Sequence, residues 1–140
     1  MLRLALADEP RFAALSIEFE RPGKSYTLDT VRALQALHPD AGFVFIIGAD
    51  TLPELHTWHR PLELLAAIRI VTLARPGCMP DPAALRLPPP WPAKLLADLR
   101  TGEPLDVSSR DLRAKIAAGQ PVSLVPEPVQ RYIQEHNLYR

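Results

Sequence analysis

The chain has 140 residues, with 16 Lys and Arg against 16 Asp and Glu, and a formal net charge of zero. This length fits one domain, and shares of 47% hydrophobic and 23% charged residues exclude a wholly disordered chain. Zero net charge argues against a protein that mainly grips the backbone of nucleic acids.

The first part of the chain predicts a helix end, a short strand, a turn and a helix. Residues 2–8 are typical of a helix end, residues 14–19 alternate as in a strand, and residues 20–24 hold the Pro and Gly of a turn. A helix is expected over residues 27–38, where apolar residues recur about every third position and Thr27 can cap the start.

The middle of the chain predicts two buried strands separated by short helices. The apolar run 43–47 is typical of a parallel strand that helices cover on both sides, and 70–74 is a second such strand. Prolines interrupt short helical pieces within residues 52–67. Seven of the 16 prolines lie in residues 76–92, which we interpret as a stiff surface loop.

The last part of the chain predicts helices at 93–100, 109–118 and 128–136, with a brief strand at 105–107. Strands that alternate with helices indicate an α/β fold with a mostly parallel sheet. We expect residues 1–140 to form a single domain.

In such a sheet, ligands bind beyond the carboxyl ends of the strands. Four polar segments follow the predicted strands: 25–30, 48–50, 75–77 and 108–113. These segments are the candidates for chemistry.

Two of the segments open helices, whose free N–H groups attract anions. Ser108 and Ser109 start one helix, and Arg113 lies one turn further in, so phosphate oxygens could bind there. Thr27 starts another helix, which could hold a carboxylate or a phosphate. The residues alone favour ordinary N-caps at both places.

Gly48 and Asp50 end the first buried strand, where a glycine lets a ligand approach and a carboxylate suits ribose hydroxyls. A plain turn explains the pair equally well. Trp58 could stack on a flat ring or pack at a helix corner. His56 and His59 have a spacing that a metal site could use, but no third ligand is evident, and we assign none.

The single cysteine, Cys78, excludes an internal disulfide, and we interpret it as a loop thiol in a reducing compartment. The longest apolar run, residues 42–49, is far shorter than the roughly 20 residues of a membrane span. We therefore expect a cytoplasmic, soluble protein.

Taken together, the segments resemble the bacterial nicotinate-nucleotide adenylyltransferase family, and the resemblance covers nearly the whole chain. The matching segments stand in the order of the family: Ser25-Tyr26-Thr27-Leu28-Asp29-Thr30, Phe45-Ile46-Ile47-Gly48-Ala49-Asp50, Trp58, Arg75-Pro76-Gly77, and Val107-Ser108-Ser109 with Arg113.

The resemblance implies a Rossmann-like nucleotidyltransferase fold and transfer of AMP from ATP, with Mg²⁺, to nicotinate mononucleotide. The products are deamido-NAD and pyrophosphate. By this resemblance the helix start at Ser108 and Ser109, with Arg113, would bind the ATP phosphates, and Gly48 and Asp50 would contact the nucleotide near its ribose.

The resemblance also implies a site for the nicotinate acceptor. Thr27 and its helix-start amides would meet the nicotinate carboxylate, and Trp58 would stack on the pyridine ring. Tyr26 belongs to the same set of substrate-binding residues. An acid rather than an amide suits a place where free N–H groups converge.

The sequence departs from the family pattern in two places. Arg110 stands where the phosphate motif normally has its Thr, and the His-x-Gly-His segment of the family is absent. We therefore expect an N-terminally incomplete fold, no catalytic residue in this chain, and severely impaired transfer by the chain alone. We also expect exposed sheet edges that favour a homo-oligomer.

Two other functions remain open. One is an adenylyltransferase of the same fold with another acceptor, such as pantetheine phosphate. The other is a non-catalytic module for nucleotide binding or assembly. Neither reading expects a nucleic acid or a membrane as partner.

Overall fold

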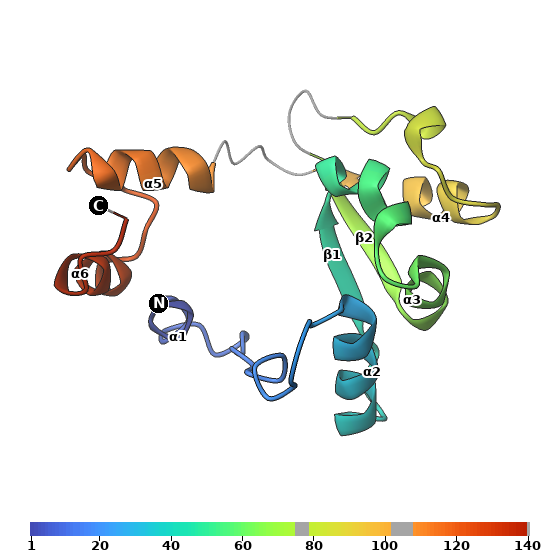
Figure 1. Ribbon diagram of the computed structural model, residues 1–140, viewed down its shortest axis with the longest axis horizontal. Coiled ribbons are helices and arrows are strands. Elements are labelled where there is room, and N and C mark those ends of the chain that lie inside the picture. The colour runs from blue at the N-terminus through green and yellow to red at the C-terminus, as the bar shows by residue number, and fades with distance from the viewer. Residues whose placement is uncertain (75–78, 102–107, 140) are drawn as a thin grey trace. The chain divides into compact units, whose positions relative to one another are not determined.

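The computed structural model describes residues 1–74, 79–101 and 108–139. They separate into two compact units: one spans Ile17–Leu105, and the other joins Met1–Ser16 to Asp106–Arg140. Figure 1 shows the helices and strands of both. This division does not test the single-domain expectation, which stays a prediction.

The Ile17–Leu105 unit is built on a parallel sheet of three strands, in the order β1-β2-β3. The strands are β1 (Val44–Gly48), β2 (Arg69–Ala74) and β3 (Leu99–Thr101). The register pairs Ile47 with Thr72, and Thr72 with Leu99. The predicted α/β fold with a mostly parallel sheet is confirmed.

Short helices connect and flank these strands. They are α2 (Thr27–Leu37), the 3-10 helix η1 (Ala49–Thr57), α3 (Pro61–Ala67), the 3-10 helix η2 (Pro82–Ala84) and α4 (Trp91–Ala97). The chain passes from β1 directly into η1 (Figure 1). Pro61 opens α3 at a position where the missing N–H of proline would have had no helical partner.

The core of this unit consists of two hydrophobic clusters. Leu55 and Leu64 are fully buried, one in each cluster, and burying a side chain of this size contributes about 1.5–3 kcal/mol. The indole of Trp58 is partly buried and packs against both clusters. The start of α2 and the carboxyl end of β1, which carry candidate site residues of this unit, are therefore attached to the core of the Ile17–Leu105 unit.

The second unit contains α1 (Leu2–Ala5), α5 (Ser109–Ala117) and α6 (Glu127–Glu135). The predicted helices in these regions are confirmed, with ends that differ by a few residues. Gly119 follows α5 with φ +67°, a left-handed conformation that glycine adopts without strain. Its N–H donates to the carbonyl of Ile116, which closes the helix.

The predicted strand at residues 14–19 is wrong. Residues 12–16 have no regular secondary structure, residues 17–20 form a turn, and Phe19 is 91% exposed. The carbonyl of Glu18 accepts a hydrogen bond from the Ser25 hydroxyl, so the segment bonds to its own loop. Alternation of apolar residues is a local pattern, whereas a strand also needs a neighbouring strand as partner.

The prediction that helices cover both faces of the first buried strand is also wrong. The side chains of β1 alternate: Ile47 is buried, whereas Val44 and Ile46 are 50% and 60% exposed. Leu73 of β2 is 46% exposed. A continuous apolar run is therefore compatible with one covered face as well as with two.

The proline-rich segment is more than a surface loop. Leu85 and Leu87 are only 6% and 9% exposed and belong to the larger core cluster. The helix predicted at 93–100 begins and ends earlier, and Leu99 and Arg100 belong to β3 instead. The strand predicted at 105–107 lies outside the described residues. No helix in the described part of the chain is long and apolar enough to cross a membrane.

A candidate nucleotide site at the strand ends and helix starts

The start of α2 carries two predicted site residues, Tyr26 and Thr27. Tyr26 has an extended backbone as the N-cap residue, and its carbonyl accepts hydrogen bonds from the N–H groups of Asp29 and Thr30, at 3.0 and 3.2 Å. The prediction that the Thr27 side chain caps the helix is wrong, because Thr27 is the first helical residue and no side chain makes a cap hydrogen bond. The positive end of the helix dipole lies here, so an anion would be stabilised.

A stacked pair of rings connects the start of α2 to the segment after η1. The rings of Tyr26 and His59 lie 4.0 Å apart between centroids, with an interplanar angle of 20°. Trp58, the neighbour of His59 in the chain, packs edge-to-face on Phe45 of β1 at 6.1 Å. The stack therefore places the start of α2, with Tyr26 and Thr27, next to the chain segment that contains Trp58. These are the three residues predicted to bind the acceptor.

Sequence analysis did not find His59 as part of this arrangement. His59 follows Trp58 directly, and a single polar residue in a bend gives no periodic signal that would predict a ring partner. Only the tertiary packing of α2 shows that its ring stacks on Tyr26.

Charged side chains hold α2 against α3 near this arrangement. Arg32 of α2 donates to Glu63 of α3 at 2.8 Å, and Arg60 also contacts Glu63. The hydrogen bond from Arg60, more than that from Arg32, holds the pKa of Glu63 below its ordinary value. The Gln35 side chain donates to the carbonyl of Ala67 at 2.8 Å. These contacts fix the direction of the helix whose start is the candidate anion site.

Gly48 and Asp50 lie at the carboxyl end of β1, as predicted. The backbone of Gly48 is extended (φ −76°, ψ 152°), a conformation open to any residue. A Cβ atom at Gly48 would collide with Oδ1 of Asp50 and lie 3.5 Å from its Cγ. The glycine therefore leaves room for the Asp50 carboxylate, whose side chain lies at the exposed edge of the sheet.

Ser108, Ser109 and Arg113 lie at the start of α5, in the other unit. The N–H of Asp111 donates to the hydroxyl of Ser108 at 3.3 Å, so Ser108 is an N-cap. Ser109, Arg110 and Arg113 are exposed. The structure describes these residues only within their own unit.

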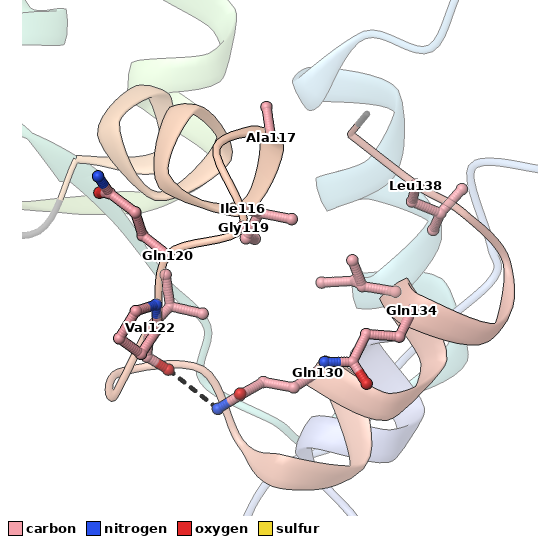
Figure 2. Close-up of a pocket in the computed structure, with 10 residues that line it drawn as sticks. Ile116, Ala117, Gly119, Gln120, Val122, Gln130, Gln134 and Leu138 are labelled. Atoms are coloured by element: carbon pink, nitrogen blue, oxygen red, sulfur yellow. Dashed lines mark hydrogen bonds between the residues drawn. The ribbon is translucent and has the colours of Figure 1, made fainter.

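A hollow of about 790 Å³ lies between the end of α5 and α6 in the same unit (Figure 2). Ile116, Val122 and Leu138 contribute apolar surface, and Gln130 donates to the carbonyls of Val122 and Val125 at 2.9 and 2.6 Å. The predicted site residues of α5 do not line this hollow. The hollow therefore gives no support to the predicted nucleotide contacts of α5.

Some of the predicted segments lie outside the described residues. They are Arg75-Pro76-Gly77, Cys78 and Val107.

The described residues offer groups for phosphate, ribose and an aromatic acid, and little for a metal held by protein alone. No group of three or more His, Cys, Asp and Glu side chains in residues 1–74, 79–101 and 108–139 could hold a metal ion. Mg²⁺ commonly binds through one or two carboxylates together with substrate phosphates and water. The single carboxylate of Asp50 fits a metal that arrives with its phosphates.

Comparisons with known proteins give one family. No protein-family model matches the chain. Curated relatives named "Probable nicotinate-nucleotide adenylyltransferase" match nearly all of it. The relative from Symbiobacterium thermophilum is 45% identical and covers 99% of this chain and 68% of its own length. Those from Exiguobacterium sibiricum and Roseiflexus sp. are both 43% identical, over 69% and 70% of their lengths.

Solved structures give the same fold. The nicotinic acid mononucleotide adenylyltransferase of Plasmodium falciparum, complexed with APC, has a TM-score of 0.63 and 19% identity. It matches 84% of this chain, which spans 60% of that one. The same enzyme complexed with NaAD has a TM-score of 0.62 and 19% identity, over 83% of this chain and 58% of that one. These likenesses confirm the predicted nucleotidyltransferase fold.

Proposed function

The chain belongs to the nicotinate-nucleotide adenylyltransferase family, and on this premise we propose that it takes part in transferring AMP from ATP to nicotinate mononucleotide. A phosphate oxygen of the acceptor attacks the α-phosphorus of ATP. The bond from that phosphorus to the bridging oxygen breaks, and its electron pair leaves with pyrophosphate. The products are deamido-NAD and pyrophosphate, so the reaction belongs to NAD biosynthesis.

The residues proposed for ATP are Gly48, Asp50, Ser108, Ser109 and Arg113. Asp50 stands at the carboxyl end of a parallel strand, where ribose hydroxyls commonly find a carboxylate. Arg113 offers the planar fork of donors that binds phosphate oxygens in pairs. Mg²⁺, when bound with ATP, would neutralise phosphate charge, and Asp50 is the described residue that would contact it.

The residues proposed for nicotinate mononucleotide are Tyr26, Thr27 and Trp58. The amides at the start of α2 would hold the carboxylate, since that end of a helix attracts anions. The indole of Trp58 would stack on the pyridine ring. The observation that carries the proposal is the stack of Tyr26 on His59, because it places the start of α2 beside the segment of Trp58.

Binding of competing acceptors tests the proposal. The chain is titrated by calorimetry with nicotinate mononucleotide and, separately, with pantetheine phosphate, in the presence of a non-hydrolysable ATP analogue. Binding of nicotinate mononucleotide alone supports the proposal. Binding of pantetheine phosphate overturns it in favour of another acceptor, and binding of the analogue alone overturns it in favour of a non-catalytic module. Slow transfer by this chain alone, and its cytoplasmic location, stay predictions.

We also propose that two copies of the chain pair through β1. The strand lies at the edge of the sheet in the described residues, and Val44–Gly48 contains no charged residue and no proline. Such a strand offers a free row of backbone donors and acceptors. A two-fold axis would pair the two β1 strands antiparallel, and the exposed side chains of Val44 and Ile46 would meet across it. Light scattering across a concentration series tests this: a dimer that dissociates on dilution is expected, and a monomer throughout overturns it.

A further inference from the structure

The segment before α2 is fastened to the helix by a chain of side-chain hydrogen bonds. The Thr30 hydroxyl donates to Oε1 of Glu18 at 2.7 Å, and the Arg21 guanidinium donates to the Thr30 hydroxyl oxygen. The Ser25 hydroxyl donates to the backbone carbonyl of Glu18 at 3.1 Å. Glu18 is thus held at both its carboxylate and its carbonyl.

The direction of these hydrogen bonds is chemically consistent. A hydroxyl has one hydrogen to donate and lone pairs to accept, so Thr30 can accept from Arg21 and donate to Glu18 at once. A charged group at each end of the chain strengthens both hydrogen bonds. The Thr30 hydroxyl therefore connects the guanidinium to the carboxylate.

The Arg21 end of this connection is partly buried, whereas its Glu18 end is exposed. The Nε atom of Arg21 is buried and has no hydrogen-bond partner in the described residues. Removing the Thr30 hydroxyl would also take away the partner of the Nη2 group of the same guanidinium. Leaving a charged group without a partner costs more than the hydrogen bond itself contributes.

The hydrogen bonds close a turn that leads directly into the N-cap of α2. The turn at residues 17–20 continues into a bend at residues 21–23, where Gly23 has φ +85°, and Tyr26 follows three residues later. Thr30 lies in the first turn of α2, and its N–H donates to the carbonyl of Tyr26. The Thr30 side chain and backbone therefore bind both the turn and the N-cap residue.

We infer that Thr30, acting with Glu18 and Arg21, is a positioning residue for the nicotinate carboxylate. It fixes the backbone of Tyr26 and the first-turn amides of α2 in the orientation that receives the anion. This inference rests on the proposed function. Thr30 itself touches the turn rather than the substrate, so it acts through Tyr26 and Thr27.

The test compares Thr30→Val, which keeps the shape and removes the hydroxyl, with Thr30→Ser, which keeps the hydroxyl. The first readout is amide hydrogen exchange without ligand. In Thr30→Val the amides of Asp29 and Thr30 should exchange about tenfold faster, as expected for loss of a charge-assisted hydrogen bond, while the amides of β2 are unchanged. Thr30→Ser should exchange as the parent does. Unchanged exchange in Thr30→Val overturns the inference.

The second readout is ligand affinity. Thr30→Val should bind nicotinate mononucleotide about tenfold more weakly and ATP as tightly as the parent, and Thr30→Ser should restore the loss. The double variant with Arg21→Met and Thr30→Val should lose no more affinity for nicotinate mononucleotide than either single variant, because the two groups act as a unit. Equal weakening of both ligands means a merely structural role and overturns the inference. If the parent chain does not bind nicotinate mononucleotide, the proposed function fails, and the positioning role fails with it even if the exchange result holds.

Discussion

The close approach of Asp50 to Gly48 predicts an unusual result for Gly48→Ala. The extended backbone at this position accepts alanine, and replacing glycine at such a site stabilises a protein by about 0.4–1 kcal/mol. The new Cβ would, however, fall inside the 3.0 Å that real Cβ atoms keep from other heavy atoms, against Oδ1 of Asp50. It would lie at ordinary contact distance, 3.5 Å, from Cγ. The variant should therefore fold while its carboxylate turns away.

The size of the effect follows from that displacement. Oδ1 must move by on the order of 1 Å to reach van der Waals separation. A hydrogen bond to a charged group contributes about 1.5–3 kcal/mol. Losing most of the hydrogen bond between Asp50 and ATP should therefore weaken ATP binding by about tenfold or more. Asp50→Ala should give a loss of similar size.

A double-mutant cycle assayed by ATP titration tests this reasoning. In the Asp50→Ala background, Gly48→Ala should change ATP affinity by less than about twofold, because the group it displaces is gone. Urea denaturation of each variant controls for folding. If the losses in ATP affinity add in the double variant, the reasoning is refuted. A Gly48→Ala chain that does not fold would also refute it.

Three further predictions concern the core, the ion pairs and the sheet edge. Leu55→Ala should lower the free energy of unfolding by about 2–5 kcal/mol in urea denaturation, because Leu55 is fully buried; a change below about 1 kcal/mol would contradict the described core. The hydrogen bond from Arg69 holds the pKa of Asp98 below its ordinary value. The stabilisation from this hydrogen bond is therefore present above the ordinary carboxyl pKa and lost as the pH falls through the lowered pKa. The difference in free energy of unfolding between the parent and Asp98→Asn should disappear in acid. A difference independent of pH would contradict this prediction. Ile46→Lys should leave stability nearly unchanged and convert the proposed dimer to monomer in light scattering, whereas an unchanged dimer would place the interface elsewhere.

The sequence predicted β1, β2 and α2 well, because their signals are local, whereas the residues of β3 were predicted as part of a helix. An apolar run such as residues 43–47, ended by Gly48, indicates a strand without knowledge of its neighbours. Leu28 and Val31, at helical spacing, are both buried in the observed α2. Leu37 continues the same helical spacing but is 65% exposed, since a buried face extends only as far as its partner helix reaches.

The features that sequence analysis missed depend on tertiary partners. Residues 14–19 alternate correctly but find no neighbouring strand. Leu85 and Leu87 lie among prolines, and only the completed core shows that they are buried. The partners of Thr30 and of Tyr26 lie nine to 33 positions away in the chain, and no spacing rule predicts such contacts.

The candidate site was predicted as a set of segments, and the structure adds their geometry. Physical reasoning alone left the helix starts as ordinary N-caps, and resemblance gave the roles. In the structure Ser108 is an N-cap, which agrees with the interpretation as an ordinary cap. It is also compatible with phosphate binding at the same helix start. Loop and cap residues do not predict a ligand by themselves, because the same free amides can be satisfied by a capping side chain or by a bound anion.

Fluorescence of Trp58 tests the central claim most directly. Trp91→Phe leaves Trp58 as the only tryptophan of the chain. Titration with nicotinate mononucleotide should quench its emission to saturation, because the pyridine ring stacks on the indole. Nicotinamide mononucleotide has an amide in place of the carboxylate. Its half-maximal quenching should need a concentration at least about tenfold higher, because the start of α2 favours an anion. Absence of quenching, or equal response to the acid and the amide, would contradict the account.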